Sequence, residues 1–438
     1  MDSLLDGMAN DGAPTGRRVP VLMPVALDQT YDYRVPSELE LEPGAFVLVP
    51  FGPQTRIGVV WDRPLDDSGK PVDPKKMKAV VDRLEVPSLP IVSMRFAEWV
   101  AKYTLAPAGM VLRMMMSAQT AFEPPKLRTG VRAVEGAALP PRMTPARARA
   151  LQLAEDGLIR SKSALAELAG CSTGVVDGLV ESGNLVECAI PPKPCPQPNP
   201  LHRVTEFGDD QARAVHALLS AVDAQNFSVS LLDGVTGSGK TEVYFEAVAR
   251  TLELGRQALI MLPEIALTSQ FMQRFERRFG AAPVEWHSAV SGPERGRIWC
   301  AAATGEARIV IGARSALFLP FADLGLIVVD EEHDAGYKQD DRVHYQARDM
   351  SVVRGRLGNF PVVLASATPA IESHVNARTG RYRHLMLPGR YSGAELPEIA
   401  AIDLRAEQPD KGRWLAPRLV SAIAETIEKG QQTLLFLN

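Results

Sequence analysis

The stretch that decides the fold is a glycine-rich loop, Gly234-Val235-Thr236-Gly237-Ser238-Gly239-Lys240-Thr241. It matches in full the phosphate-binding pattern G-x-x-x-x-G-K-S/T. The apolar run at 227–232 predicts a strand before the loop, and residues 242–254 predict a helix after it. In that setting the glycines let successive N–H groups point at one phosphate chain, and the helix start adds its positive dipole end. We expect the loop to cradle a nucleoside triphosphate through every residue except Val235, with Lys240 on the outer phosphates and Thr241 on Mg2+.

An acidic box follows a second strand. The continuous apolar run at 324–329 predicts a strand covered on both faces, and it ends in Asp330-Glu331-Glu332-His333. Ligands of doubly wound sheets bind beside such strand ends. We therefore expect Asp330 to hold Mg2+ and Glu331 to orient or deprotonate the attacking water. His333 is a candidate sensor of the nucleotide.

A hydroxyl motif ends a third predicted strand. The run at 360–365 is closed by Ser366-Ala367-Thr368-Pro369. Taken alone, this is ordinary turn chemistry. Because it follows the phosphate loop and the acidic box in order, each at a strand end, we expect Ser366 and Thr368 to transmit the state of the nucleotide to a bound polymer.

Two further segments complete a recognisable set, LPEIALT at 262–268 and IGARSA at 311–316. Together with the loop, the box and Ser-Ala-Thr, they resemble the motifs of superfamily 2 DNA helicases. Their residues are most similar to those of the PriA family of replication-restart helicases. The resemblance runs from about residue 18 to the last residue, and it is strongest in the helicase segment. It implies an ATP-dependent 3′-to-5′ DNA helicase that uses ATP and Mg2+, recognises stalled forks and initiates primosome assembly.

The resemblance also implies nucleotide and DNA contacts. Gln211 resembles the glutamine that reads adenine, since an amide can both donate and accept; the alternative is a glutamine on a helix surface. Thr268, Arg314 and Ser315 are expected on the DNA backbone, where contacts position DNA without reading its sequence.

The segment 337–349 mixes aromatic and basic residues and resembles a family loop that couples DNA binding to hydrolysis. Aromatic rings suit stacking on single-stranded bases, and cations attract phosphate. A solvated polar loop is the alternative, and Gln346 stands where the family has His. The expected DNA contacts in this segment are Tyr337, Lys338, Arg342, Tyr345 and Arg348.

The N-terminal part predicts short strands with prolines at their ends, then a helix at 92–103, as in a small β-barrel-like module. By resemblance this module grips the 3′ end of a nascent DNA strand. Tyr31 would line the pocket, and Asp32 would accept a hydrogen bond from the 3′ hydroxyl and repel a terminal phosphate. The alternative is that Tyr31 and Tyr33 are strand-face residues and that Asp32 lies in a turn.

Residues 140–188 predict a winged-helix unit. Thr144-Pro145 opens a helix, 163–180 read as helix–turn–helix, and 184–188 would be the wing strand. The second helix of the pair carries Asp177 and Glu181 but little basic charge, which argues against sequence-specific readout of the major groove. Packing or positioning at a fork is the expected role.

The expected fold class is multidomain, with a β-rich module, a winged helix and a parallel-sheet RecA-like lobe. The parts are a disordered tail at 1–17, a 3′-DNA-end-binding domain at 18–118, a winged helix and Pro-rich linker at 119–200, the first ATP-binding helicase lobe at 201–392, and a linker with the truncated start of a second lobe at 393–438. The last part predicts a helix at 419–429 and a strand at 433–438. The family's arginine fingers and zinc-binding cysteine insert are absent from this sequence, so we expect ATP and DNA binding, slow hydrolysis and no unwinding.

Composition restricts the compartment and the partners. The 4 Cys form no Cys-x-x-Cys pair, which excludes a zinc ribbon within this chain and fits a reducing, cytoplasmic environment. The polar N-terminus is not a signal peptide, and no apolar run reaches the roughly 18 residues of a membrane span. Because the net charge is −4, affinity for DNA must come from local basic patches. The expected partners are forked and single-stranded DNA with 3′ ends, primosome-loading proteins and single-stranded DNA-binding protein.

Two other functions remain open from the sequence. One is a different superfamily 2 DNA translocase, which would not prefer a 3′-hydroxyl end. The other is a non-catalytic DNA-binding adaptor, in which the ATP site only stabilises the fold.

Overall fold

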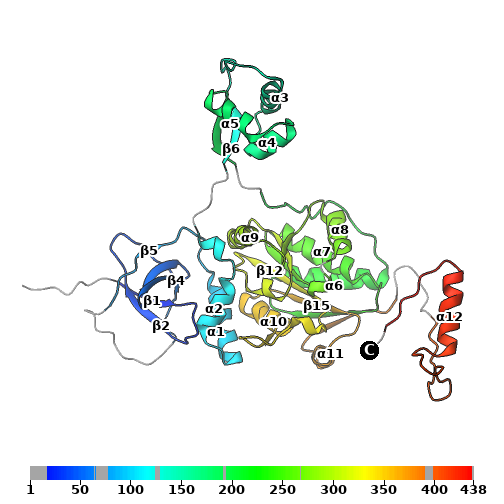
Figure 1. Ribbon diagram of the computed structural model, residues 1–438. Helices are drawn as coiled ribbons and strands as arrows, with labels where there is room; N and C mark the ends of the chain where they lie inside the picture. Colours follow the sequence, from blue (N-terminus) through cyan, green and yellow to red (C-terminus); the bar gives the residue numbers. More distant parts are fainter. Residues whose placement is uncertain are drawn as a thin grey trace, which may run out of the picture. The chain divides into compact units, whose positions relative to one another are not determined.

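The computed structural model describes residues 17–63, 65, 77–123, 129–190, 194–266, 268–389 and 398–436 (Figure 1). The chain divides into two compact units, Met1–Arg390 and Tyr391–Asn438. The tail expected at 1–17 lies outside the described residues, apart from Arg17.

The N-terminal module is a five-stranded antiparallel sheet in the order β2-β1-β4-β3-β5. Its strands are β1 (Arg18–Leu22), β2 (Thr30–Arg34), β3 (Phe46–Phe51), β4 (Gln54–Val60) and β5 (Asp82–Arg83). The sheet curls on itself, because Arg34 at the end of β2 pairs with Ala79 just before β5 at the opposite edge. The barrel-like closure predicted from the sequence is therefore present.

Two helices and a 3-10 turn carry the chain from this module to the lobe: α1 (Ile91–Thr104), α2 (Ala108–Met115) and η2 (Gln119–Phe122). They share one apolar core with the lobe. The indole of Trp299 donates a 2.8 Å hydrogen bond to the carbonyl of Met115. The rings of Phe46 and Phe122 pack on that indole, with centroids 5.5 and 5.0 Å away. The module and the lobe are thus packed as one body rather than joined by a free linker.

The next segment contains three short helices and a two-stranded ribbon. These elements are β6 (Thr129–Ala133), α3 (Pro145–Ala154), α4 (Lys162–Leu168), α5 (Thr173–Glu181) and β7 (Leu185–Ala189). Thr144 caps α3 by accepting a hydrogen bond from the amide of Arg147, as its sequence predicts. The acidic side chain of Asp177 on α5 is paired with Lys162 at 2.7 Å.

The lobe is built on a parallel sheet of seven strands in the order β10-β11-β9-β12-β15-β8-β16, which confirms the predicted α/β class. The strands are β8 (Val229–Gly234), β9 (Gln257–Met261), β10 (Val284–Trp286), β11 (Ile309–Gly312), β12 (Leu324–Asp330), β15 (Val362–Ser366) and β16 (Arg383–Leu387). Alternate side chains of one strand enter two different cores, as Val328 and Val329 do on β12. This explains why the strands read as continuous apolar runs.

Helices cover both faces of the sheet (Figure 1). One core contains side chains of α6 (Asp209–Asp223), α7 (Lys240–Glu253) and α8 (Ser269–Phe279). The other contains side chains of α9 (Gly292–Thr304), α10 (Ala347–Gly358), α11 (Ile371–Arg378) and the N-terminal helices. Short elements follow several strands: η3 (Glu264–Ala266), η4 (Arg314–Phe318), η5 (Ala335–Tyr337), β13 (Lys338–Gln339) and β14 (Tyr345–Gln346).

The second unit contains one helix, α12 (Pro417–Glu428), close to the predicted one. The strand predicted at 433–438 is wrong for residues 433–436, which have no strand pairing, and 437–438 lie outside the described residues. An apolar, β-prone run becomes a strand only when a neighbouring strand supplies ladder hydrogen bonds, and the described residues supply none here.

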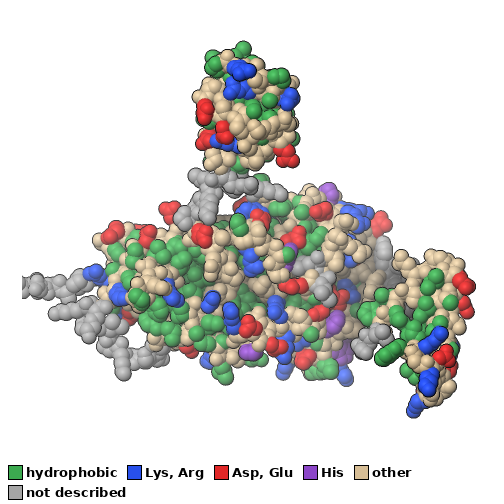
Figure 2. All heavy atoms as spheres, in the orientation of Figure 1, with side chains coloured by type: hydrophobic (Ala, Val, Ile, Leu, Met, Phe, Trp, Pro, Cys, Tyr) green, Lys and Arg blue, Asp and Glu red, His purple; other side chains and the backbone are tan. Residues whose placement is uncertain are grey.

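Charges of both signs are mixed over the surface. Figure 2 shows Lys and Arg side chains interspersed with Asp and Glu on the visible face, in keeping with the net charge of −4. Within the part of the chain that the structure describes, every helix is too short or too polar to cross a lipid bilayer.

Candidate active site

The phosphate loop has the backbone shape that its glycines predict. It connects β8 to α7, and Gly237 and Gly239 have φ values of 80° and 84°. These values lie in the left-handed region, which glycine adopts without a steric penalty. Gly234 is required for space instead, because a Cβ there would lie 2.6 Å from Oγ of Ser238 and 2.8 Å from Cβ of Leu387.

Polar groups of the loop remain available for a ligand. The Lys240 ammonium is buried and donates to the carbonyl of Gly234 at 2.7 Å. Burial lowers the pKa of Lys240, while Glu331, Asp330 and Asp233 act in the opposite direction through their charges. The hydroxyl of Ser238 is buried and finds no hydrogen-bond partner among the residues that the structure describes. A cation, an unpaired hydroxyl and the start of α7 together suit a phosphate chain.

The acidic box lies at the same edge of the sheet. Because β15 lies between β8 and β12, the ends of these two strands are one strand apart. Asp330, the last residue of β12, is buried, and burial raises its pKa. Its carboxylate accepts hydrogen bonds from the Tyr244 hydroxyl at 2.8 Å and from the Glu331 amide at 2.9 Å. The charges of Asp330 and Lys240 act on each other, so the structure brings the two predicted halves of the site together.

Glu331 and His333 lie at the mouth of this site. Glu331 has a φ of 46°, a left-handed conformation that costs about 1–3 kcal/mol for a residue other than glycine. Nδ1 of His333 lies 3.7 Å from a carboxylate oxygen of Glu331 and 2.8 Å from Oγ of Ser366. Oγ of Ser366 also accepts from the amide of Thr368 at 3.0 Å. The acidic box and the hydroxyl motif are therefore joined by a hydrogen bond.

Sequence reasoning missed two buried residues of the site. Tyr244 follows Lys240 by four positions on α7, and that spacing, which places both on one helix face, was the available signal. Glu332 is fully buried, accepts from the Ala370 amide at 2.6 Å and the Ser373 hydroxyl at 2.8 Å, and pairs with Arg348 at 3.3 Å. It connects the acidic box to α10 and α11, and no local sequence pattern indicates those partners.

Gln211 is not a free helix-surface residue. It is buried near the start of α6, where its carbonyl oxygen accepts from the Gly208 amide at 3.1 Å and its amide donates to the Ser238 carbonyl at 2.8 Å. The side chain is therefore hydrogen-bonded directly to the phosphate loop. Its polar atoms already bond to the chain itself, and reading adenine stays a prediction.

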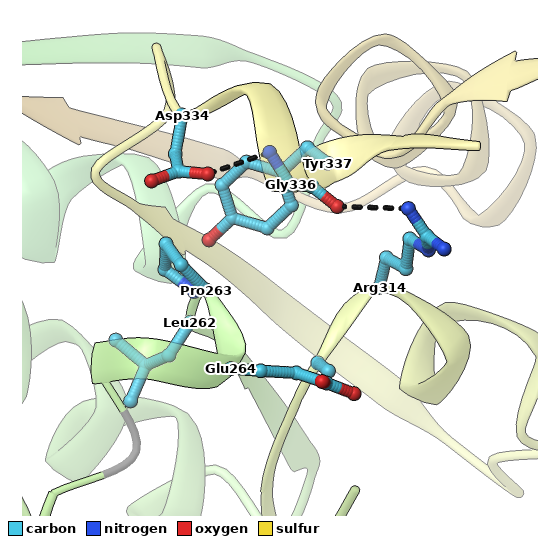
Figure 3. Close-up of a pocket in the computed structure, with 8 residues that line it drawn as sticks. Leu262, Pro263, Glu264, Arg314, Asp334, Gly336 and Tyr337 are labelled. Atoms are coloured by element: carbon cyan, nitrogen blue, oxygen red, sulfur yellow. Dashed lines mark hydrogen bonds between the residues drawn. The ribbon is translucent and has the colours of Figure 1, made fainter. Parts of the chain in front are cut away.

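Of the three residues expected to contact the DNA backbone, Arg314 lines a cavity of about 250 Å³ (Figure 3). Thr268 is exposed and caps α8 through its hydroxyl, which accepts from the Phe271 amide at 3.3 Å. Arg314 donates to the carbonyls of Gly336, at 3.1 Å, and Lys338. Ser315 is exposed, and its Oγ accepts from the Trp286 indole at 3.1 Å. The cavity is lined by Leu262, Pro263, Glu264, Ala313, Arg314, Asp334, Gly336 and Tyr337.

Three of the residues expected to bind single-stranded DNA are buried instead. Tyr337 is 1% exposed and donates to the carbonyls of Met261 and Asp330, and Tyr345 is 5% exposed in the same core. Arg348 is buried against Glu332. Side chains with so little exposed surface cannot stack on bases or contact phosphates, which corrects the expectation for Tyr337, Tyr345 and Arg348. Lys338 and Arg342 are exposed.

The expected 3′-end residues lie on β2. Tyr33 points into the barrel core, and Tyr31 packs at its margin, edge-on to Phe51 with centroids 5.2 Å apart. Asp32 is not in a turn: it lies within the strand, on the opposite face from the two tyrosines. Its side chain is 24% exposed and lies 3.7 Å from the guanidinium of Arg18.

The N-terminal module and the ATP-binding lobe each match a known family. Residues 20–117 match the family described as 3'DNA-binding domain (3'BD), and residues 209–376 match the DEAD/DEAH box helicase family. A protein called replication restart protein PriA, from Haemophilus influenzae, is 37% identical over 442 aligned residues, which cover 96% of this chain. Nearly all of this chain is therefore similar to a replication restart protein PriA. It spans 58% of the length of that relative.

Two other PriA proteins are also similar to this chain. The one from Rickettsia conorii is 33% identical over 95% of this chain and 53% of its own length. The one from Bacillus subtilis is 37% identical over 61% of this chain and 34% of its own length. The chain spans about half the length of the first two of these relatives.

Solved structures that resemble the chain are more distant. RecG bound to a three-way DNA junction aligns with 52% of this chain and 29% of its own at 20% identity, with a TM-score of 0.37. The Hef helicase domain of Pyrococcus furiosus aligns with 40% of this chain and 37% of its own at 19% identity and a TM-score of 0.31. At these scores the likeness supports no conclusion about function.

Proposed function

We propose that this chain binds and hydrolyses ATP with Mg2+ as the motor part of a replication-restart helicase that moves 3′-to-5′ on DNA. The observation that carries the proposal is the meeting of the phosphate loop and the acidic box at strand ends one strand apart, with Lys240 and Asp330 acting on each other through their charges. The similarity to PriA proteins over most of the chain and the match of residues 209–376 to the DEAD/DEAH box helicase family support it.

Each residue of the site would have a separate role in ATP hydrolysis. Lys240 exchanges its bond to the Gly234 carbonyl for one to the outer phosphates, and the loop amides bind the phosphates between them. Thr241 and Asp330 would hold Mg2+, which supplies charge neutralisation on the phosphates. Burial holds the pKa of Asp330 high, a cost that a bound dication offsets. Glu331 orients the attacking water.

The link from nucleotide to DNA runs through His333 and Ser366. Their 2.8 Å contact joins the mouth of the site to the end of β15. A change at Glu331 reaches His333 across 3.7 Å and then the turn that contains Thr368. Thr268, Arg314 and Ser315, with Lys338 and Arg342 beside them, would contact the phosphate backbone of the DNA strand.

The N-terminal module would select the DNA end. In β2, Asp32 offers a partly exposed carboxylate that accepts from a 3′ hydroxyl, and the guanidinium of Arg18 is near enough to contact the last phosphate. Tyr31 lies on the other face of β2, where its ring packs on Phe51, so it would support this strand rather than line the pocket. The expected substrates are forked and single-stranded DNA with 3′ ends, in the cytoplasm, and the expected protein partners are primosome-loading proteins and single-stranded DNA-binding protein.

DNA-stimulated ATP turnover tests the proposal. It predicts a rate for the wild type that rises with 3′-tailed DNA, and background rates for Lys240→Ala and Glu331→Gln. His216→Ala, an exposed change on α6, is the control and should match the wild type. Equal turnover rates for the wild type and the three variants would contradict the proposal and favour a non-catalytic adaptor. Turnover that is stimulated equally by 3′-hydroxyl and 3′-phosphate ends would point to a different superfamily 2 translocase.

A further inference from the structure

Three side chains that can bind a metal ion meet at the edge of the sheet, next to the phosphate loop. They are Asp233 near the end of β8, His374 on α11 and His384 on β16, and their ligand atoms all lie within 4.8 Å of one another. Nε2 of His384 lies 3.0 Å from Oδ2 of Asp233. The two imidazole rings are nearly perpendicular, with centroids 5.9 Å apart.

The fold accounts for this meeting. In the parallel pair of β16 and β8, His384 is opposite Leu231, so Asp233 lies two residues further along the neighbouring strand. Side chains two positions apart share one face of a sheet, which puts His384 and Asp233 together. The helix α11 contacts both strands and supplies His374. Three separate elements therefore bring one donor each.

The donor set suits one class of metal ion. Two imidazoles and a carboxylate with a fourth position open to water are a zinc ligand set, whereas Mg2+ prefers oxygen ligands and retains its waters. In a tetrahedral site with bonds of about 2.0–2.1 Å, donor atoms lie roughly 3.3 Å apart. The pair of His384 and Asp233 is already near that separation.

His374 is free to complete the set. It is exposed, and among the described residues its ring makes no hydrogen bond. A movement of roughly 1.5 Å would bring its nitrogen to the separation required by the bond lengths of zinc, and rotation of an exposed side chain supplies it. The hydrogen bond between Asp233 and His384 is enough to explain why those two side chains lie together without a metal. It does not explain why the imidazole of His374 lies beside them.

We propose that Asp233, His374 and His384 bind one divalent transition-metal ion of the zinc class, which fastens the edge strand β16 and α11 to β8. Metal binding itself does not depend on the proposed ATPase. Its effect on nucleotide does rest on that function. Asp233 directly precedes Gly234, and its carboxylate acts on the Lys240 ammonium, so a dication there would shift the charge balance beside the phosphates.

Zinc titration of the 438-residue chain, after chelator treatment and alkylation of its four cysteines, tests the proposal. Competition with a chromophoric chelator should show one zinc ion per chain. His374→Ala should weaken this binding by at least about tenfold, as even changes to a ligand's hydrogen-bond partner do. His384→Ala should do the same, and His216→Ala on α6 should not.

Two readouts keep the test independent of folding and of hydrolysis. Co2+ should give visible absorption with the wild type and His216→Ala, but not with His374→Ala, whose exposed side chain is the one least needed for the fold. Zinc should raise Tm of the wild type and of His216→Ala, but not of His374→Ala. Zinc bound equally by the wild type and His374→Ala, or bound only before alkylation, would overturn the proposal. Loss of ATP turnover in Lys240→Ala with zinc binding intact separates this site from the nucleotide site.

Discussion

The hydroxyl of Tyr244 donates a 2.8 Å hydrogen bond to Oδ2 of Asp330, and both side chains are buried. Tyr244 lies on α7, the helix that begins with Lys240, so one helix supplies the phosphate-binding lysine and a bond to the carboxylate expected to bind the metal. Burial raises the pKa of both groups, and the bond to Tyr244 counteracts this on Asp330. The phenol thus favours the ionised form of the carboxylate, against the effect of burial, and fixes its position.

Replacing Tyr244 with Phe tests this role. The ring keeps its packing, but Asp330 loses a donor in a desolvated site, which should lower the free energy of unfolding by about 1–3 kcal/mol. The Mg2+ concentration needed for half-maximal ATP turnover should rise. Urea denaturation and a Mg2+ titration measure the two effects. Tyr103→Phe, a change at a ring that is 66% exposed, should alter neither. An unchanged Mg2+ requirement in Tyr244→Phe would contradict the role.

Glu332 should matter more for stability than its exposed neighbours. Glu332→Ala removes the charge that faces the buried Arg348 and the acceptor for Ser373, and breaking a buried pair in this way costs about 3–5 kcal/mol. Asp349 also pairs with Arg348, at 2.8 Å, but its side chain is 51% exposed, so Asp349→Ala should cost no more than about 1 kcal/mol. Chemical denaturation of both variants gives the comparison. Equal losses of unfolding free energy in the two variants would show that the buried carboxylate contributes no more to stability than the exposed one.

Ser366→Ala should separate hydrolysis from its stimulation by DNA. The change removes the partner of His333 without touching the phosphate loop. Basal ATP turnover should persist, while stimulation by single-stranded DNA should fall about tenfold, which corresponds to about 1.4 kcal/mol of lost coupling. Thr379→Val, an exposed hydroxyl at the end of α11, is the matched control. Stimulation that survives in Ser366→Ala would exclude this route from nucleotide to DNA.

Asp32 should decide which DNA end is bound. Because a hydrogen bond to a charged group contributes about 1.5–3 kcal/mol, Asp32→Ala should reduce the preference for 3′-hydroxyl over 3′-phosphate ends by about tenfold or more. Asp82→Ala on β5, an exposed change in the same sheet, should leave the preference intact. Fluorescence anisotropy with the two labelled oligonucleotides measures it. The idea is wrong if both variants bind like the wild type.

The sequence predicts the sheet and the strand-end residues because both depend on local signals. Glycine spacing, continuous apolar runs and a carboxylate at a strand end place Lys240 and Asp330 correctly, since parallel strands end at one edge. The same reasoning fails at Tyr337 and Tyr345. Their mixture of aromatic and basic neighbours is equally compatible with stacking on bases and with burial, and only the packing between β12, α10 and η4 decides for burial.

Long-range partners explain what else was missed. Glu332 receives its hydrogen bonds from residues 38 and 41 positions away, and Tyr244 reaches Asp330 across 86. The spacing of Tyr244 from Lys240 places both on one helix face but does not identify Asp330 as its partner, and no pattern around Glu332 identifies its partners. The strand predicted at 433–436 fails for a related reason, because β-propensity does not reveal whether a pairing strand is present.

Equilibrium binding of ATP with and without Mg2+ tests the central claim most directly, because the claim is that two distant segments form one nucleotide–metal site. Wild type, Lys240→Ala and Asp330→Asn are compared by calorimetry. The account predicts that Mg2+ tightens ATP binding to the wild type by at least about tenfold, a coupling of about 1.4 kcal/mol. It also predicts that Asp330→Asn binds ATP but loses that gain, and that Lys240→Ala binds weakly in both conditions. An equal gain from Mg2+ in the wild type and in Asp330→Asn would contradict it.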